Sequence, residues 1–224
     1  MRVMLGMLAR SDRSQEPYLD ETLSIVSPCF DGIFILDDEG CRIDDYSAQR
    51  NRLIEVGERE HYDWMFMLDS DECMFPSDIE VLKTRMTPEN RLLVLPRYEF
   101  VKDLDHYDPQ GYPDYQGRVF RLGIGYQFRK TVHEGLYRRY FPVSEMRLQR
   151  GVRCDDTPIY HYGRVKSTAE MLLKLHNYNL IAKGQPPVTE LPEGTDISNG
   201  EWLWGAITRF EAPHPLRDQD PGSR

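Results

Sequence analysis

The sequence predicts an α/β fold, a single domain in which a mostly parallel central sheet is flanked by helices. Over residues 1–100, short apolar runs alternate with segments of helical periodicity, which is typical of strand-helix-strand units. The length of 224 residues allows one core of ordinary size. We therefore expect one domain over residues 1–211, and we expect the polar, proline-rich residues 212–224 to form a flexible tail.

The individual elements follow from the spacing of the apolar residues. The run 64–68 is apolar at every position, which indicates a strand buried on both faces. Ser167 and Glu170 form a capping-box pattern ahead of a helix that stops at Gly184. Further strands are expected at 3–9, 33–36, 92–95 and 119–122, and further helices at 17–26, 46–57 and 77–85.

Composition and charge exclude several classes of protein. No window approaches the length of an apolar membrane span, and the first residues lack the features of an export signal, so we expect a cytoplasmic protein without a transmembrane segment. The four cysteines lack CxxC spacing and are expected to be free thiols. The net charge is -9, yet residues 118–153 hold nine Arg or Lys against two Glu, which makes this segment +7 and the remainder -16. The asymmetry fits an anionic ligand at one face, or arginines paired with the acidic remainder.

Two of the predicted strands end in carboxylates. The buried strand at 64–68 is followed by Asp69, Ser70 and Asp71, a DxD triplet, and the strand at 33–36 is followed by Asp37 and Asp38. Parallel neighbouring strands bring their carboxyl ends to one edge of a sheet, where ligands bind in open α/β folds. Because Mg2+ and Mn2+ prefer oxygen ligands, the triplet is a candidate cation site. The alternative is a solvated acidic turn.

Other candidate residues lie in the second half of the chain. Glu134 lies in the arginine-rich segment, where nearby positive charge would keep it ionised as a general base, although a salt-bridged structural role is the alternative. Arg118 and Arg121 could stabilise charge that develops on a phosphate group. His161 follows an apolar segment and could equally be a hydrogen-bonded core histidine.

Aromatic residues add two further candidates. Residues 103–117, rich in Asp, Tyr, Pro and Gly, are expected to be a loop whose tyrosines Tyr107, Tyr112 and Tyr115 either cover a ligand or pack on the surface. For Trp202 and Trp204 we favour a role as anchors of the C-terminal segment over a role in an acceptor site.

Several motifs together resemble one family, the family 2 glycosyltransferases of GT-A fold, particularly the short bacterial and phage type linked to lipopolysaccharide or capsule synthesis. The resemblance runs from about residue 2 to about residue 183. It rests on FILDD at 34–38, AQRN at 48–51, FMLDSDE at 66–72, RVFR at 118–121, VHEGL at 132–136 and IYHYG at 159–163. The order and spacing of these motifs carry the resemblance.

The resemblance implies a metal-dependent, inverting transfer of a sugar from a nucleoside-diphosphate sugar to a hydroxyl acceptor such as a saccharide, with Mn2+ or Mg2+ as the cofactor. Its implied metal ligands are Asp71 and His161, with Asp69 beside the metal or the ribose. Glu134 would face the acceptor. The implied nucleotide-binding residues are Asp37 or Asp38 at the base and Arg50 nearby.

Three alternatives to this interpretation remain open. A nucleotidyltransferase would usually show a glycine-rich phosphate loop near the N-terminus, which LARSDRSQEP does not offer. A degenerate transferase fold could bind a nucleotide sugar or glycan without catalysis. The same chemistry could also act on a hydroxylated DNA base, which the +7 segment permits and the net acidity disfavours.

Overall fold

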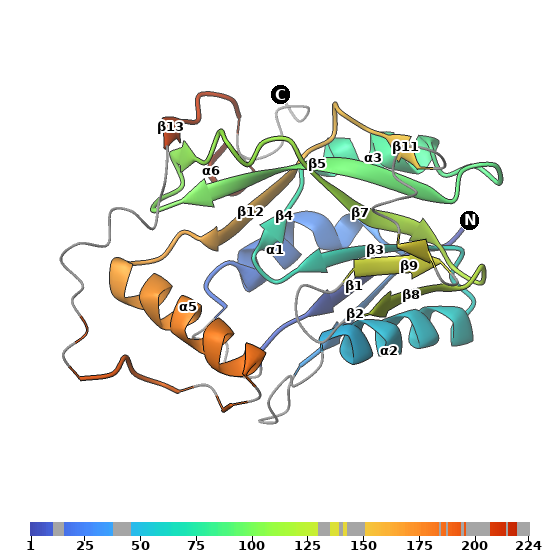
Figure 1. Ribbon diagram of the computed structural model, residues 1–224. Coiled ribbons are helices and arrows are strands. Elements are labelled where there is room, and N and C mark those ends of the chain that lie inside the picture. The colour runs from blue at the N-terminus through green and yellow to red at the C-terminus, as the bar shows by residue number, and fades with distance from the viewer. Residues whose placement is uncertain are drawn as a thin grey trace.

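The computed structural model describes most of the chain, and the central mixed sheet has helices on both of its faces (Figure 1). The described residues are 1–10, 16–37, 46–129, 135–138, 141–142, 151–183, 185–186, 188–193, 195, 207–213 and 215–218. Five residues singled out from the sequence lie outside the described residues, namely Asp38, Glu134, Gly184, Trp202 and Trp204.

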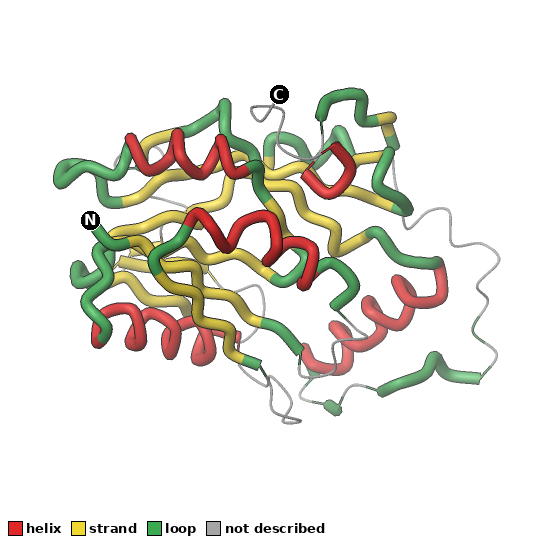
Figure 2. The backbone as a smooth tube through the Cα atoms, turned by 180° about the vertical axis from the view of Figure 1, so that it is seen from behind, coloured by secondary structure: helices red, strands yellow, loops and turns green. Residues whose placement is uncertain are grey.

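The N-terminal part of the sheet is parallel, as expected. Strand β1 (Val3–Leu8) lies between β2 (Gly32–Leu36) and β3 (Trp64–Asp69) and pairs with both in parallel. Helix α1 (Leu19–Val26) connects β1 to β2, and α2 (Tyr46–Arg59) connects β2 to β3. The first connection leads from β1 to the neighbour on one side of it, and the second leads from there to the neighbour on its other side. The two connecting helices therefore cover opposite faces of the sheet (Figures 1 and 2).

The rest of the sheet is mostly antiparallel, which corrects the predicted mostly parallel sheet. Across all the described strands of this ten-stranded sheet, five pairings are antiparallel and four are parallel. The strands at 92–101, 106–107 and 114–121 follow one another through short connections, so the later two pair with the first in antiparallel. The strands at 152–153 and 159–164 come much later in the chain and pair with the strand at 92–101 in parallel. The added strands are β4 (Glu72–Cys73), β5 (Leu92–Val101), β6 (His106–Tyr107), β7 (Asp114–Arg121), β11 (Val152–Arg153), β12 (Ile159–Arg164) and β13 (Thr208–Arg209).

The remaining elements lie around this sheet. A second sheet of three strands consists of β8 (Tyr126–Arg129), β9 (Gly135–Arg138) and β10 (Phe141–Pro142). The other helices are η2 (Ser27–Cys29), α3 (Pro76–Thr84), α5 (Thr168–Ala182) and α6 (Pro215–Asp218).

The two faces of the sheet have separate hydrophobic clusters. On β3, Trp64, Phe66 and Leu68 belong to the cluster on the α1 and α3 side, whereas Met65 and Met67 belong to the cluster on the α2 side. All five side chains are buried, so the prediction of a strand covered on both faces is confirmed.

One expectation for an irregular segment needs correction, and a second segment is described only in part. The predicted loop at 103–117 contains β6 and the start of β7, because its tyrosines suit a pleated, half-buried surface better than its Pro and Gly content suggested. Within the predicted tail, Leu216 of α6 packs against the core, so residues 215–218 are docked on the domain.

Other local predictions agree with the structure. The backbone N–H of Ser167 donates to Glu170 Oε2 at 2.7 Å, and the N–H of Glu170 donates to Ser167 Oγ at 3.3 Å, which confirms the capping box of α5. Cys29, Cys73 and Cys154 are free cysteines. Within the described part of the chain, no helix is long and apolar enough to span a bilayer.

Candidate functional site

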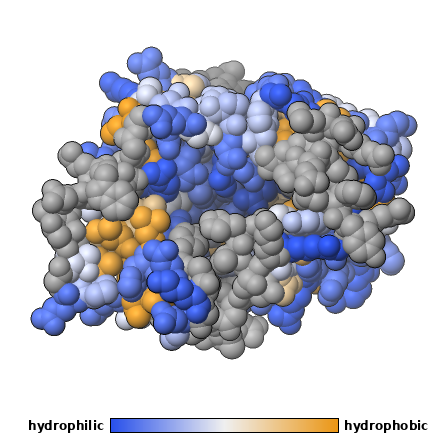
Figure 3. Space-filling model, viewed as in Figure 1, coloured by the Kyte–Doolittle hydropathy of each residue, from blue (hydrophilic) through white to orange (hydrophobic). Residues whose placement is uncertain are grey.

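The site lies where the order of the parallel strands reverses. In the order β2-β1-β3, the carboxyl ends meet at Leu8, whose partners are Leu36 on β2 and Asp69 on β3. Open α/β sheets bind ligands outside the carboxyl ends of their strands at this switch point. Hydrophilic side chains gather in a hollow over β4 and β12 on this side of the molecule (Figure 3).

Asp69 holds two arginines that come from different elements. Its Oδ1 accepts a hydrogen bond from Arg50 Nη2 of α2 at 2.5 Å, and its Oδ2 accepts one from Arg118 Nη2 of β7 at 2.6 Å. Burial by itself would raise the pKa of Asp69, but Arg118 and Arg50 hold that pKa well below its usual value. Both carboxylate oxygens of Asp69 are therefore engaged by protein cations.

Glu72 extends this network into the interior. It is fully buried on β4, and its Oε1 accepts hydrogen bonds from Arg118 Nη2 at 2.8 Å and from Arg97 Nη1 at 3.2 Å. Its Oε2 accepts the backbone N–H of Asp69 at 3.0 Å. Arg97 also donates to Asp114 at 2.8 Å. The buried charges are thus compensated through several hydrogen bonds, as a low-dielectric site requires.

His161 connects the acidic turn to β5. Its Nδ1 lies 2.7 Å from Glu99 Oε2, and its Nε2 lies 3.3 Å from Asp71 Oδ1. Burial would lower the pKa of His161, but Asp71 and Glu99 raise it to about 10. Burial likewise opposes ionisation of Asp71, whose pKa is nonetheless lowered, mainly by His161. A protonated imidazole bridging two carboxylates is the state that these contacts favour.

Strand pairing positions His161 and Asp71. His161 on β12 is the register partner of Glu72 on β4 and of Glu99 on β5. The N–H of Tyr162 donates to the carbonyl oxygen of Asp71 at 2.8 Å. These backbone contacts fix the β3–β4 turn against β12, so the two side chains face each other.

Gly163 lets the side chains of His161 and Asp71 approach the backbone of β12 closely. A Cβ atom at this position would lie 2.5 Å from His161 Nε2 and 2.7 Å from Asp71 Oδ2. Only a residue without a side chain permits this arrangement. Within the described residues, no group of three or more His, Cys, Asp and Glu side chains is arranged to hold a metal ion.

Ser70, the middle residue of the triplet, contacts the start of the chain. Its hydroxyl donates to Glu16 Oε2 at 2.6 Å, while Glu16 Oε1 accepts the backbone N–H of Arg10 at 3.0 Å. Burial raises the pKa of Glu16. Glu16 is a further carboxylate at this edge of the sheet that the sequence did not single out.

The structure brings together most of the described candidate residues. Arg50, Asp69 and Arg118 are in direct contact, and Asp71 lies against His161. The resemblance implied either Asp37 or Asp38 at the nucleotide base, and Asp37 directly follows Leu36 at the same edge of the sheet.

Arg121 is the exception, because β7 is antiparallel to β3. It pairs with Trp64 at the opposite end of β3, about 16 Å along the strand from Asp69. Its Nη1 donates to the carbonyl oxygen of Pro88 at 3.1 Å. Its predicted role at the phosphate site therefore needs correction.

The tyrosines of 103–117 also lie elsewhere. Tyr112 stacks on Tyr98 with ring centroids 4.0 Å apart, and Tyr107 packs edge-on against Tyr98 and Phe210. Tyr115 donates its hydroxyl hydrogen to Asp155 Oδ1 at 2.5 Å.

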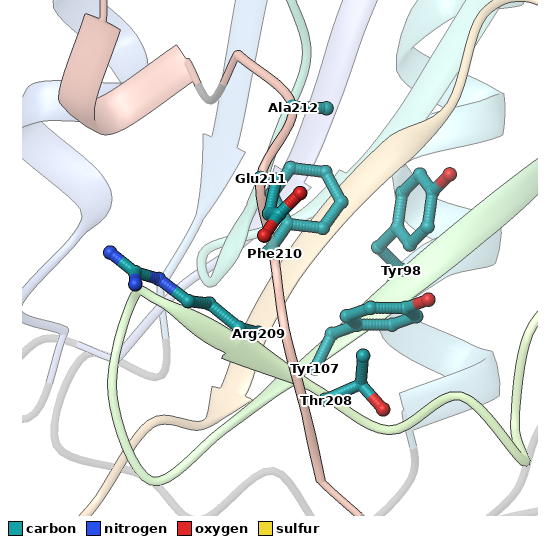
Figure 4. Close-up of a pocket in the computed structure, with 7 residues that line it drawn as sticks. All are labelled: Tyr98, Tyr107, Thr208, Arg209, Phe210, Glu211 and Ala212. Atoms are coloured by element: carbon teal, nitrogen blue, oxygen red, sulfur yellow. The ribbon is translucent and has the colours of Figure 1, made fainter.

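A pocket of about 410 Å³ lies beside this aromatic group (Figure 4). It is lined by Tyr98, Tyr107, Thr208, Arg209, Phe210, Glu211 and Ala212. Since Tyr98 and Glu99 are adjacent on β5, they point to opposite faces, and the pocket lies across the sheet from His161.

Glu72, Arg97 and Glu99 were missed by sequence reasoning. Arg97 and Glu99 lie on β5 beyond Pro96, and the predicted strand ended at residue 95. The alternation of charged residues with Tyr98 and Phe100 was a usable signal, since it has the period of a strand that is polar on one face.

No protein-family model matches the chain, and no curated protein matches it. Among solved structures, 15 chains match. A197 from STIV is 19% identical, with a TM-score of 0.33 over 48% of this chain and 51% of that chain. A glycosyltransferase involved in the glycosylation of the major capsid of PBCV-1 is 15% identical, with a TM-score of 0.35 over 54% of this chain and 60% of that chain.

The CMP:2-keto-3-deoxy-manno-octonic acid synthetase complexed with CTP is 15% identical, with a TM-score of 0.29 over 70% of this chain and 91% of that chain. The match thus spans about half the length of the first structure and 60% of the second. These are distant structural similarities, and the geometry of the site carries the proposal that follows.

Proposed function

We propose that the chain is a metal-dependent glycosyltransferase that moves a sugar from a nucleoside-diphosphate sugar to a hydroxyl group of a saccharide-type acceptor. The observation that carries the proposal is the convergence of four separate segments at the switch point. Arg50, the Asp69–Asp71 turn, Arg118 and His161 come from motifs far apart in the sequence and meet at one edge of the sheet.

Asp71 and His161 would supply a carboxylate oxygen and an imidazole nitrogen to a divalent cation, and the cation would displace the Nε2 proton of His161. His161 Nε2 and Asp71 Oδ1 lie 3.3 Å apart, and both side chains lie against the backbone of Gly163. Glu99 accepts the Nδ1 proton of His161, which is the usual arrangement for orienting a metal-bound histidine. With both of its oxygens on arginines, Asp69 serves as an anchor of Arg50 and Arg118 in this proposal.

Asp71 and His161 would hold the Mn2+ or Mg2+, which would supply Lewis-acid stabilisation of the departing diphosphate. The chain's own residues do the rest. Arg118 and Arg50 are held rigidly by Asp69, so their positive charge is preorganised at the site where phosphate charge develops. Asp37 follows the end of β2, which β1 separates from β3, and in this proposal it accepts a hydrogen bond from the ribose or base. Glu134 stays our predicted general base.

Removal of Asp71 tests the metal assignment. In a thermal-shift screen of UDP, GDP, CMP and dTDP sugars, we expect Mn2+ to raise the melting temperature further with one donor class, because a ligand that binds only the folded state stabilises it. Asp71→Ala should lose this Mn2+ effect and sugar transfer. Asp20→Ala, which removes an exposed carboxylate of α1, is the matched control and should keep both.

Full Mn2+-dependent transfer by Asp71→Ala would show that the metal assignment is wrong. Glu134→Gln should bind the donor with unchanged affinity but lose transfer, and unchanged turnover would remove Glu134 from its role as base. A salt titration of DNA binding distinguishes the acceptor classes, since binding to a DNA acceptor weakens steeply with added salt.

A further inference from the structure

Asn51, the last residue of the AQRN motif, takes no part in the proposed transfer, yet its side chain makes two hydrogen bonds to a distant strand. It lies on α2, and its Nδ2 donates to the carbonyl oxygen of Phe128 on β8 at 2.9 Å. Its Oδ1 accepts the backbone N–H of the same residue at 2.7 Å. The two residues are 77 positions apart in the sequence, and β8 lies alongside α2 (Figure 1). One side-chain amide therefore ties the helix to the strand.

These two bonds satisfy the outer edge of β8. The described strands of the small sheet have the order β10-β9-β8, in which Phe128 pairs with Leu136 of β9. In an antiparallel pair, the backbone groups of successive residues point alternately toward the partner strand and away from it. Both backbone groups of Phe128 point to Asn51, so the side-chain amide takes the place of a peptide group on a further strand. The position of β8 against α2 is thus fixed at Phe128.

Phe128 in turn contacts Arg50, the neighbour of Asn51 on α2. The Arg50 Cζ lies over the Phe128 ring at 5.4 Å from its centroid, which is within the range of a cation–π interaction. The ring itself is buried and packs edge-on against Phe120, with centroids 6.2 Å apart. At its edge, the same guanidinium group donates from Nη2 to Asp69 Oδ1 at 2.5 Å.

The two contacts of Arg50 restrict different movements. The hydrogen bond to Asp69 holds one edge of the guanidinium group, and the Phe128 ring limits the tilt of its plane. An arginine side chain has many rotamers, so each such restraint lowers the entropy that is lost when it binds an anion. A fixed positive charge is also the most effective one at a phosphate whose charge develops during a reaction.

We infer that Asn51 is a positioning residue, which holds Phe128 in place and thereby sets the orientation of the Arg50 guanidinium group toward the donor diphosphate. This inference rests on the proposed function, in which Arg50 stabilises the charge of that diphosphate. Asn51 touches neither the donor nor the reacting atoms. Its effect on binding passes through the backbone of Phe128 and the face of its ring.

Inorganic pyrophosphate is a suitable probe, because it carries the diphosphate without the unknown base and sugar. Its affinity for the full chain is measured by titration calorimetry in the presence of Mn2+. Asn51→Ala removes both bonds to Phe128. Asn177→Ala is the matched control, since Asn177 of α5 makes the same pair of bonds to the backbone of Val188, donating at 3.0 Å and accepting at 2.8 Å.

We expect Asn51→Ala to weaken pyrophosphate binding about ten-fold, the usual effect of losing one hydrogen bond to a charged group. Asn177→Ala should stay within about two-fold of wild type, which is less than the loss of one such bond. Phe128→Leu keeps an apolar side chain but removes the ring face, so it should weaken pyrophosphate binding as Asn51→Ala does. It replaces Asn51→Ala if that variant fails to fold.

A double-mutant cycle tests whether Asn51 acts through Arg50. Arg50→Gln should itself weaken pyrophosphate binding, and adding Asn51→Ala to it should cause less than about two-fold further loss. A structural role alone would lower the melting temperature and leave the affinity of the folded protein unchanged. Equal losses from Asn51→Ala in both backgrounds would show that it acts by another route, and would overturn the inference.

The outcomes separate this inference from the proposed function. Unchanged pyrophosphate affinity in Asn51→Ala or, where that variant does not fold, in Phe128→Leu would overturn the positioning role and leave the proposed diphosphate site standing. Absence of pyrophosphate binding to the wild type would instead overturn that site. In that case NMR decides the positioning role, because the ring current of Phe128 shifts the Nε–H resonance of Arg50. Movement of this resonance in Asn51→Ala, with none in Asn177→Ala, supports the role, and an unmoved resonance refutes it.

Discussion

Arg118→Met tests whether the buried charge network holds the site together. Arg118 is buried, and its Nη2 donates to Asp69 Oδ2 at 2.6 Å and to Glu72 Oε1 at 2.8 Å. Methionine fills much of the same volume without the charge. The substitution leaves Asp69 with Arg50 alone and leaves the fully buried Glu72 with Arg97 at 3.2 Å.

Removal of one partner of a buried ion pair costs about 3–5 kcal/mol, because the other charge stays buried without compensation. With a urea m-value of about 2–3 kcal/mol/M for a chain of this size, the unfolding midpoint should fall by about 1–2.5 M. Arg121→Met makes the same substitution three residues along β7, where one hydrogen bond to a carbonyl oxygen is lost. Its expected cost is about 1 kcal/mol or less.

The stabilisation of the fold by Asp69 depends on pH in a definite direction. Arg118 and Arg50 lower the pKa of Asp69 in the folded state, so ionised Asp69 stabilises the fold above its unfolded pKa of about 3.9. This contribution is lost as the pH falls through the folded pKa. The difference in the free energy of unfolding between wild type and Arg118→Met should therefore be largest near neutral pH and should become smaller below about pH 4.

A double-mutant cycle isolates the pair itself. If Arg118 and Glu72 are coupled, Arg118→Met combined with Glu72→Gln should cost less than the sum of the two single variants, by about 1–3 kcal/mol. A loss below about 1 kcal/mol for Arg118→Met, or strict additivity in the cycle, would refute this account of the network.

Three further predictions concern single positions. Gly163→Ala should keep the fold but weaken Mn2+ binding at least ten-fold in calorimetry, roughly the loss of one ligand contact. The reason is that the new Cβ would lie 2.7 Å from Asp71 Oδ2. Unchanged affinity would contradict the proposed cation site. Ser167→Ala should cost about 1 kcal/mol, seen as a melting temperature about 2–4 °C lower, because it removes the N-cap of α5; an unchanged melting temperature would mean the cap contributes nothing. Gly32→Ala should cost about 1–3 kcal/mol in urea unfolding, since its Cβ would collide with the hydroxyl of Tyr62 and lie 2.7 Å from the ring carbon Cζ; a neutral result would show that the ring can move.

The sequence predicted the N-terminal part of the fold well because its signals are local. The apolar run of β3 and the helical spacing of α2 are each visible in a window of a few residues, and β1, β2 and β3 form with the expected parallel pairing. The switch-point position of Asp69 follows directly from that order.

The second half of the fold depends on contacts between distant residues. The two-residue strand β4 exists because Glu72 and Cys73 pair with His161 and Tyr160, nearly ninety positions later in the chain. No local pattern marks so short a strand. The full burial of Glu72 is equally invisible, since an acidic residue after an acidic turn has the composition of a solvated surface.

The acidic turn shows what the structure adds to a motif. In the sequence, Asp69, Asp71 and Glu72 are equivalent carboxylates within four positions. Strand geometry separates them: Asp69 ends β3 toward α2 and meets Arg50, Asp71 lies in the turn against His161, and Glu72 enters β4 under Arg118. Two of the three are fully engaged with arginines, so the proposed cation is assigned to Asp71, which lies beside an imidazole held by Glu99. The chemistry of the motif is thus decided by which neighbour each carboxylate meets, and those neighbours come from α2, β5, β7 and β12.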